Sequence, residues 1–220
     1  MRSATANGGA PTSASAGESA PVKITIPGLE IVSMTLTLVG DSPLIVHRFS
    51  EKARKMMRDK QTGAATQKKA AKDIFLDYCE SMYWLSPMPE SPTEDDVARA
   101  TFGFPTIAFK AAAADAALRG ADLKKTDVLA SFHIPGEFLR IIGKPTMRED
   151  VARVGMGTAD LRHRGQFFPW SVEVPVRFNR RMITAEQVVN LFNIAGFSTG
   201  VGEWRPQKKG SYGMFHVEVA

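Results

Sequence analysis

The order in which strand-like and helix-like segments alternate constrains the fold more than any other feature of this sequence. In the first half, residues 33–39 alternate like a strand and residues 108–118 favour a helix. In the second half, residues 168–178 and 184–196 repeat that order before the glycine-rich segment 196–213. Strands mixed with helices in this way predict an α+β protein. The expected core is ferredoxin-like (RRM-like), either once or as two such halves, with helical and loop insertions.

Local signals predict where several of these elements begin and end. Ser50 is expected to cap a helix over residues 51–60, and a second helix is expected from Ala65 to Tyr78. The segment Thr184-Ala-Glu-Gln187 matches a capping box, so a helix should begin there. Pro175 has no amide hydrogen, which predicts an edge position or a bulge in its strand.

Composition along the chain predicts its domain organisation. Residues 1–22 are mostly small or polar and cannot bury enough apolar surface to order, so a disordered tail is expected. Residues 23–220 are expected to form a single RRM-like domain, with a charged insertion over about 48–100. Residues 145–166 are polar and contain glycines, which predicts a long loop excursion.

Several protein classes are excluded or disfavoured by the same composition. The apolar block of a secretory signal is missing, and no apolar run is long enough to cross a membrane. Cys79 is the one cysteine, so a disulfide within the chain is excluded. A cytoplasmic protein is therefore expected.

The charges are separated into two blocks. The net charge is +5 and the sequence pI is about 9.4. Residues 48–72 are strongly basic, whereas residues 73–96 contain acidic side chains and neither Lys nor Arg. One interpretation is two solvated faces that pair with each other. The other is a basic arm that grips a polyanion, beside an acidic segment that contacts the basic face of another subunit.

The glycine-rich segment 196–213 is the most informative candidate for binding. Its glycines allow a backbone to approach a ligand closely, its cations suit phosphates, and its aromatic rings suit unpaired bases. The candidate residues are Gly200, Gly202, Trp204, Arg205, Lys208, Lys209 and Tyr212. The segment lacks the Gly-Lys-Ser/Thr ending of a P-loop. The alternative is a flexible hairpin whose glycines serve only the turns.

Basic residues elsewhere extend this candidate nucleic-acid surface. Arg162 and Arg164 stand beside aromatic residues that could equally belong to the core. Lys110 is the one charge at the start of a helix-forming stretch, where it either contacts a phosphate or simply faces solvent. The basic arm contributes Arg48, Lys52, Lys55 and Arg58.

Catalytic signals are weak. The four histidines are scattered without metal-ligand spacing, and a nucleophile elbow is absent. Asp41, or the pair Glu149-Asp150, could hold magnesium, although the flanking Arg148 and Arg153 are expected to neutralise that pair. No catalytic residue, metal site or cofactor is predicted, and a non-enzymatic function is favoured without settling the question.

Three segments together resemble a known family. The helix start Phe104-Pro-Thr-Ile-Ala-Phe-Lys110, the segment Gly40-Asp-Ser-Pro-Leu-Ile-Val-His47 and the closing Gly200-Val-Gly202 with Gly210-Ser-Tyr-Gly213 occur in the order found in the RAMP superfamily. Proteins of that superfamily form the backbone of CRISPR effector complexes. The resemblance implies an RRM-like fold, head-to-tail stacking of subunits, and single-stranded nucleic acid along the stack. Ala111 and Ala112 stand where the family has glycine. Asp41 does not align with the aspartate that cleaves RNA in some members, so no nuclease activity is implied.

The chain also resembles small proteins encoded by tailed phages, in segments such as Gly200-Val-Gly-Glu-Trp-Arg-Pro206. The sequence therefore predicts a phage-encoded protein of the host cytoplasm that binds single-stranded RNA or DNA and assembles into oligomers or filaments. Two alternatives stay open. One is a structural protein that oligomerises through its charged segments without nucleic acid, and the other is a metal-dependent nuclease.

Overall fold

The computed structural model describes residues 28–63, 73–120, 123–154 and 158–218. Within these ranges the strands are β1 (Ile31–Gly40), β2 (Leu44–Ile45), β3 (Tyr83–Trp84), β4 (Phe102–Pro105), β5 (Phe132–His133), β6 (Phe138–Ile142), β7 (Pro145–Val154), β8 (Thr158–Phe167), β9 (Ser171–Asn179) and β10 (Phe215–Val217). The helices are α1 (Glu51–Gln61), α2 (Ile74–Glu80), α3 (Glu94–Arg99), α4 (Thr106–Ala116), α5 (Lys125–Ser131) and α6 (Ala185–Ser198), with the short 3-10 turns η1 (Ala117–Arg119) and η2 (Pro206–Lys208). The tail expected over 1–22 lies outside the described residues.

The topology of the larger sheet identifies the core. Its strand order is β10-β1-β9-β6-β4-β3, with β5 paired to β9, and the paired strands are antiparallel. Along the chain, β1, α4, β6, β9, α6 and β10 follow one another as β-α-β-β-α-β, which is the ferredoxin-like arrangement. The predicted α+β class and ferredoxin-like core are therefore confirmed. The described residues contain one such core, so the alternative with two halves is wrong.

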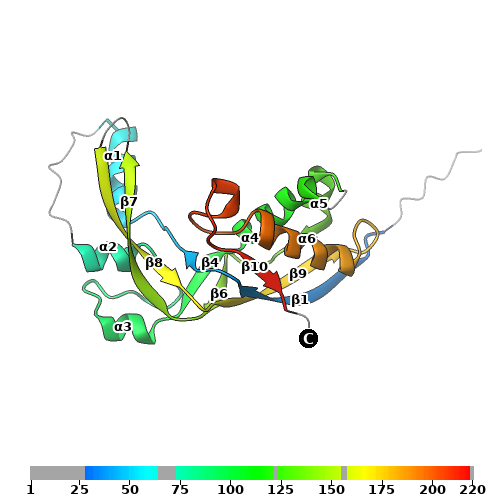
Figure 1. The fold of residues 1–220 in the computed structure, drawn as a ribbon, viewed down its shortest axis with the longest axis horizontal. Coiled ribbons are helices and arrows are strands. Elements are labelled where there is room, and N and C mark those ends of the chain that lie inside the picture. Colours follow the sequence, from blue (N-terminus) through cyan, green and yellow to red (C-terminus); the bar gives the residue numbers. More distant parts are fainter. Residues whose placement is uncertain (1–27, 64–72, 121–122, 155–157, 219–220) are drawn as a thin grey trace, which may run out of the picture.

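The two core helices cover one face of this sheet (Figure 1). In β1, Leu36 and Leu38 are buried while Thr35 is exposed, as the strand period of two requires. Helix α6 begins with the predicted capping box: the Thr184 hydroxyl accepts from the Gln187 amide, and the Gln187 side chain accepts from the Thr184 amide. The helix runs to Ser198, two residues beyond the predicted end at residue 196.

The loop predicted over residues 145–166 is wrong, because the chain there forms a long hairpin. Strands β7 and β8 pair in register from Pro145 opposite Phe167 to Val154 opposite Thr158. Strand β2 joins β8 to make a second, three-stranded sheet. The prediction failed because both faces of β7 carry polar residues, so the alternation of apolar and polar residues that indicates a strand is absent. Ion pairs between β7 and β8 contribute to holding the hairpin together.

Two smaller predictions also need correction. The helix expected from Ala65 begins, in the described residues, at Ile74, because Asp73 caps it by accepting from the Leu76 amide. Residues 64–72 lie outside the described part. Pro175 sits in the interior strand β9, opposite Thr35 of β1, and not at an edge. It is tolerated because β5 and β6 pair with other positions on the opposite side of that strand.

The edge of the larger sheet at β10 is covered by α6. The Asn193 side-chain oxygen accepts from the Val217 amide at 2.8 Å, so this edge donor is satisfied. Gly196 lies so close that a Cβ there would stand 1.7 Å from the Phe215 carbonyl oxygen. Only glycine allows this approach of helix and strand.

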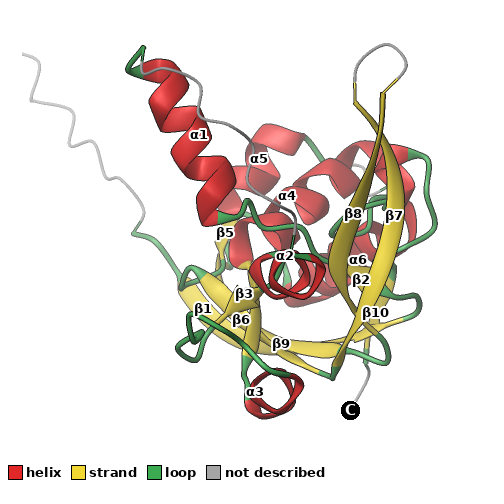
Figure 2. Cartoon of the chain, turned by 90° about the vertical axis from the view of Figure 1, so that its left-hand side faces the viewer, coloured by secondary structure: helices red, strands yellow, loops and turns green. Residues whose placement is uncertain are grey.

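Helix α1 and the hairpin β7–β8 project from one end of the molecule as two separate arms (Figure 2). Ser50 caps α1 as predicted, by accepting from the Ala53 amide at 3.1 Å. Among the described residues, no helix combines the length and the apolar character needed to cross a bilayer.

Candidate nucleic-acid interface

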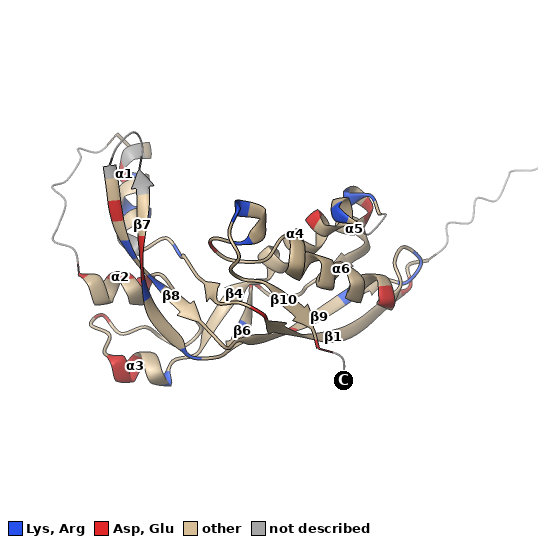
Figure 3. Ribbon diagram, in the orientation of Figure 1, with Lys and Arg blue, Asp and Glu red and all other residues tan. Residues whose placement is uncertain are grey.

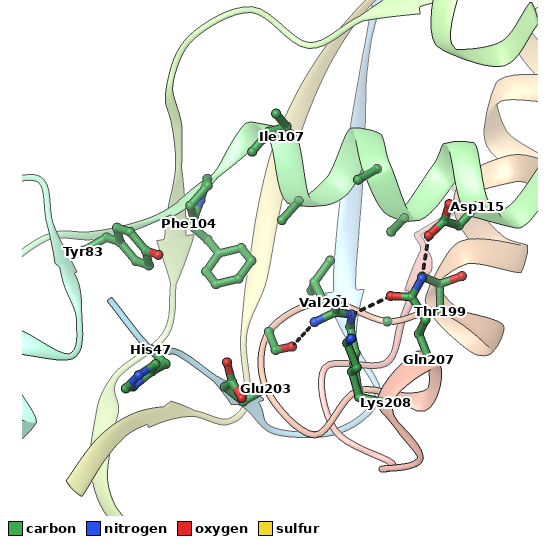
Figure 4. Close-up of a pocket in the computed structure, with 17 residues that line it drawn as sticks. His47, Tyr83, Phe104, Ile107, Asp115, Thr199, Val201, Glu203, Gln207 and Lys208 are labelled. Atoms are coloured by element: carbon green, nitrogen blue, oxygen red, sulfur yellow. Dashed lines mark hydrogen bonds between the residues drawn. The ribbon is translucent and has the colours of Figure 1, made fainter. Parts of the chain in front are cut away.

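The glycine-rich loop between α6 and β10 borders a cavity of about 530 Å³. The opposite wall is the start of α4, including Ile107 and Ala111. His47, which follows β2, and Tyr83 of β3 close one end. Figure 4 shows Tyr83, Phe104, His47 and Glu203 at this end, and Thr199, Gln207 and Lys208 at the other.

The loop is held in one conformation by its glycines and backbone hydrogen bonds. A Cβ on Gly210 would stand 1.6 Å from the Trp204 carbonyl oxygen, and one on Gly213 would stand 1.7 Å from that of Val201. The Tyr212 amide donates to the same Trp204 carbonyl at 3.1 Å. The glycines therefore allow close packing of the loop backbone in addition to its turns.

Trp204 adopts an unusual backbone conformation and remains at the surface. Its φ is 54°, in the left-handed region that bulky residues rarely occupy, and its side chain is 43% exposed. Such a conformation costs about 1–3 kcal/mol and persists only where surrounding contacts enforce it. Lys209 has a similar φ of 66° and is also exposed. The loop thus presents an indole ring and a cation on an ordered backbone.

Arg205 is held at the cavity wall by a chain of hydrogen bonds. Its Nη1 donates to the Gly202 carbonyl at 2.9 Å, and its Nε donates to Gln207 Oε1 at 3.1 Å. Gln207 in turn donates to Asp115 of α4. The Lys125 ammonium also contacts Asp115 and, as the largest cause, lowers the pKa of that carboxyl. The negative charge of Asp115 is thereby compensated by Lys125. Arg205 and Lys208, which line the same part of the cavity, therefore stay available for an anion.

The base of the hairpin joins the glycine-rich loop at Tyr212. The Arg148 guanidinium stacks on the Tyr212 ring, with Cζ 4.7 Å from the ring centroid, and donates to its hydroxyl at 3.4 Å. The structure therefore brings together the two segments that the sequence singled out. One face of the Tyr212 ring is already occupied, which leaves Trp204 as the better stacking surface.

Arg164 does not lie on the exposed surface, contrary to the sequence-based expectation. Its side chain is 3% exposed, and Nη1 donates to Asp150 Oδ2 at 3.3 Å. Asp150 also accepts from Arg148 Nε at 2.8 Å. Arg162 is partly exposed and pairs with Asp160 at 3.6 Å. The arginines of the hairpin therefore pair mostly with carboxylates of the same hairpin. Such pairing is required for Arg164, because a buried charge is costly without a partner.

Lys110 lies away from the cavity wall as well. It donates to His133 Nδ1 at 3.1 Å and stands over the Phe132 ring, 5.9 Å from its centroid. Neither this geometry nor the cavity lining places it at a phosphate. In the basic arm, Lys55 and Arg58 are exposed on α1, and Arg48 is partly buried just before it. Lys52 lies on the same helix. In Figure 3 the ribbon is blue at Lys and Arg positions of the η2 loop and the hairpin, and red at Asp and Glu positions of α3.

The acidic residues considered for metal binding are each paired. Asp41 contacts His216 at 2.7 Å, and Glu149 contacts His163 at 2.9 Å. Asp150 pairs with Arg148, as predicted, and with Arg164, which was not predicted. The side chain of Arg153, the other predicted partner, lies outside the described part of the structure. Across the described ranges, no group of three His, Cys, Asp or Glu side chains lies together in a way that could hold a metal ion.

Sequence analysis missed part of the cavity. His47 and Tyr83 lie far from the glycine-rich segment along the chain and carry no motif, so only the folded structure reveals them. Two buried polar atoms at the wall, His47 Nδ1 and Thr199 Oγ1, have no hydrogen-bond partner among the described residues. Burial and the nearby Arg164 lower the pKa of His47, so the ring is held neutral.

Twenty chains of solved structures resemble this chain, among them the two that follow. The crystal structure of Cmr6 from Pyrococcus furiosus has a TM-score of 0.43 and 11% sequence identity, over 87% of this chain and 100% of that one. A chain of a CRISPR RNA-guided surveillance complex has a TM-score of 0.34 and 10% identity, over 84% of this chain and 67% of that one. This likeness concerns the path of the chain, and at these TM-scores it fixes no ligand or activity. No protein-family model matches the sequence, and no curated protein matches it.

Proposed function

We propose that this protein binds single-stranded nucleic acid without cleaving it. The observation that carries the proposal is the loop holding Trp204, Lys208 and Lys209 at the surface in an enforced conformation. Aromatic faces stack on unpaired bases, and lysines pair with phosphates, so this combination suits a single strand better than a duplex. The cations of the loop outnumber its one carboxylate, Glu203.

We propose further that copies assemble along the strand. Helix α3 carries Glu94, Asp95 and Asp96 in its first turn, whereas α1 exposes Lys55 and Arg58. These helices belong to the two charge blocks of the sequence, so the acidic surface of one copy can attract the basic surface of another. The structural alternative without nucleic acid relies on the same surfaces and predicts assembly that survives nuclease treatment.

The test is fluorescence anisotropy with single-stranded DNA and RNA across a salt series, followed by mass photometry of the same samples. The double variant Lys208→Ala/Lys209→Ala should flatten the log-log salt slope by about 0.7 for each lysine, because fewer counterions are released. Trp204→Ala should weaken binding roughly tenfold through lost stacking, with little change in that slope.

Matched controls separate the loop from general charge. Lys124→Ala/Lys144→Ala removes two exposed lysines that do not line the cavity and should leave the slope almost unchanged. If the loop variant and this control change the slope equally, the loop is not the contact surface. If the wild-type protein binds no strand at low salt yet forms a defined oligomer, the structural alternative is correct.

A further inference from the structure

The cavity beside the glycine-rich loop has two chemically different ends. Its volume of about 530 Å³ falls within the range of small-molecule sites, roughly 300–1,000 Å³. One end carries Arg205, Lys208 and the Thr199 hydroxyl, together with Asp115, whose charge is compensated by Lys125; the other carries aromatic rings and the Glu203 carboxylate (Figure 4). A ligand that fills it must therefore combine an anionic group with an aromatic group that donates hydrogen bonds.

The cationic end is built to receive a phosphate. Arg205 uses two of its nitrogens to hold Gly202 and Gln207, which fixes the guanidinium while leaving further N–H donors. Lys208 is exposed at the same end. Thr199 is only 1% exposed, and its Oγ1 has no partner among the described residues. A buried hydroxyl without a partner costs free energy, and a ligand oxygen would satisfy it.

The opposite end is built to receive a base. Tyr83 and Phe104 lie edge to face, with ring centroids 6.0 Å apart, and the exposed Ile107 adds an apolar wall. The Glu203 backbone is anchored, because its amide donates to the Ile45 carbonyl at 2.9 Å. An ionised carboxylate only accepts hydrogen bonds, so Glu203 demands adjacent donors on the ligand. His47 lines the same end, and its Nδ1 has no hydrogen-bond partner among the described residues.

Guanine meets this demand best among the common bases. Its N1–H and N2–H₂ groups lie side by side on one edge and match the two oxygens of a carboxylate. Uracil and thymine present carbonyl oxygens on both sides of one N–H, and these would repel Glu203. We propose that the cavity binds one guanine nucleotide, with its base at Glu203 and its phosphate at Arg205 and Thr199. The pocket would read one base of a bound single strand, so this proposal rests on the proposed function.

The experiment compares an oligothymidylate with the same strand carrying one central guanine, and it also titrates free GMP, AMP, CMP and UMP. The guanine strand should bind about tenfold tighter, as expected of a bidentate base contact. Hypoxanthine in place of guanine lacks the 2-amino group and should lose most of this preference. 7-Deazaguanine keeps the edge that faces Glu203 and should retain it.

Two substitutions locate the preference in the cavity. Glu203→Gln keeps the shape but removes the charge, and should abolish the guanine preference while the thymidine strand binds at least as well. Glu173→Gln, on the exposed face of β9, is the matched control and should change nothing. Thr199→Val should weaken GMP binding several-fold, because the Oγ1 donor is lost.

The outcomes distinguish this inference from the proposed function. If all strands bind equally and Glu203→Gln changes nothing, the base pocket is wrong while single-strand binding stands. If GMP binds selectively but no strand does, strand binding is wrong and the cavity is a site for free nucleotides. If neither strands nor mononucleotides bind, both proposals are overturned.

Discussion

The glycine-rich loop and the hairpin β7–β8 have similar sequences in one respect, since both combine Arg or Lys with aromatic residues. Their structures differ in where the charge goes. In the hairpin, Asp150 holds Arg148 and Arg164, and Asp160 holds Arg162. In the loop, Lys208 and Lys209 are exposed on a backbone fixed by glycine packing. Basic and aromatic composition alone therefore does not show which cations are available to a ligand; that depends on whether carboxylate partners are nearby.

The largest effect should come from Asp150→Ala in the hairpin. The substitution leaves Arg164 buried without its partner, and breaking a buried ion pair from one side costs about 3–5 kcal/mol. The free energy of unfolding from urea denaturation would show this loss. Asp160→Ala removes a partly exposed partner of Arg162 and should cost less than about 1 kcal/mol. Equal losses would mean that the hairpin charges are not structural.

Gly210→Ala should reduce stability less than Asp150→Ala does, but it should reduce the affinity for nucleic acid more. The added methyl would stand 1.6 Å from the Trp204 carbonyl oxygen, so the loop must move, at a cost of about 2 kcal/mol. The affinity for single-stranded nucleic acid should fall as well, because the movement of the loop displaces Trp204. Gly28→Ala is the control, because its Cβ meets no atom within 4 Å. Unchanged affinity in the Gly210→Ala variant would show that the ordered loop is not needed for binding.

The smallest effect concerns His47, which lies between the two regions. Burial lowers its pKa below 6.5, with Arg164 and Arg162 of the hairpin acting in the same direction and Glu203 of the loop opposing them. The unfolded state therefore takes up the proton first as the pH falls. This contribution to stability is present above pH 6.5 and is lost as the pH falls below it.

Urea midpoints measured across this pH window should decline more steeply for the wild type than for His47→Asn. Arg162→Met removes one of the charges that lower this pKa, so the decline should again begin near pH 6.5 but end at a higher pH than in the wild type, and its total size should be smaller. Parallel curves for all three proteins would mean that His47 is not coupled to the hairpin.

Sequence reasoning succeeded where the signal is local. The capping box at Thr184 depends on residues three positions apart, and the β1 alternation is visible in seven residues. It failed for the hairpin, whose strands are stabilised by partners across the ladder, such as Asp150 with Arg164. It also missed the cavity, because residues 47, 83, 107 and 199 meet only when α4 packs beside the glycine-rich loop. The glycines of that loop were recognised, but their close contacts with backbone carbonyl oxygens depend on the tertiary structure and could not be predicted from the sequence.

The covered edge at β10 limits how copies of this chain can join. An open strand offers a row of backbone donors and acceptors that any other strand can match, whatever its side chains. Here the Val217 amide already donates a hydrogen bond to the Asn193 side chain, and Gly196 of α6 packs directly against the Phe215 carbonyl. The larger sheet therefore does not continue from one molecule into the next through β10. The proposed assembly, where it involves this edge, would therefore depend on side-chain contacts, which are specific to the partner and readily reversed.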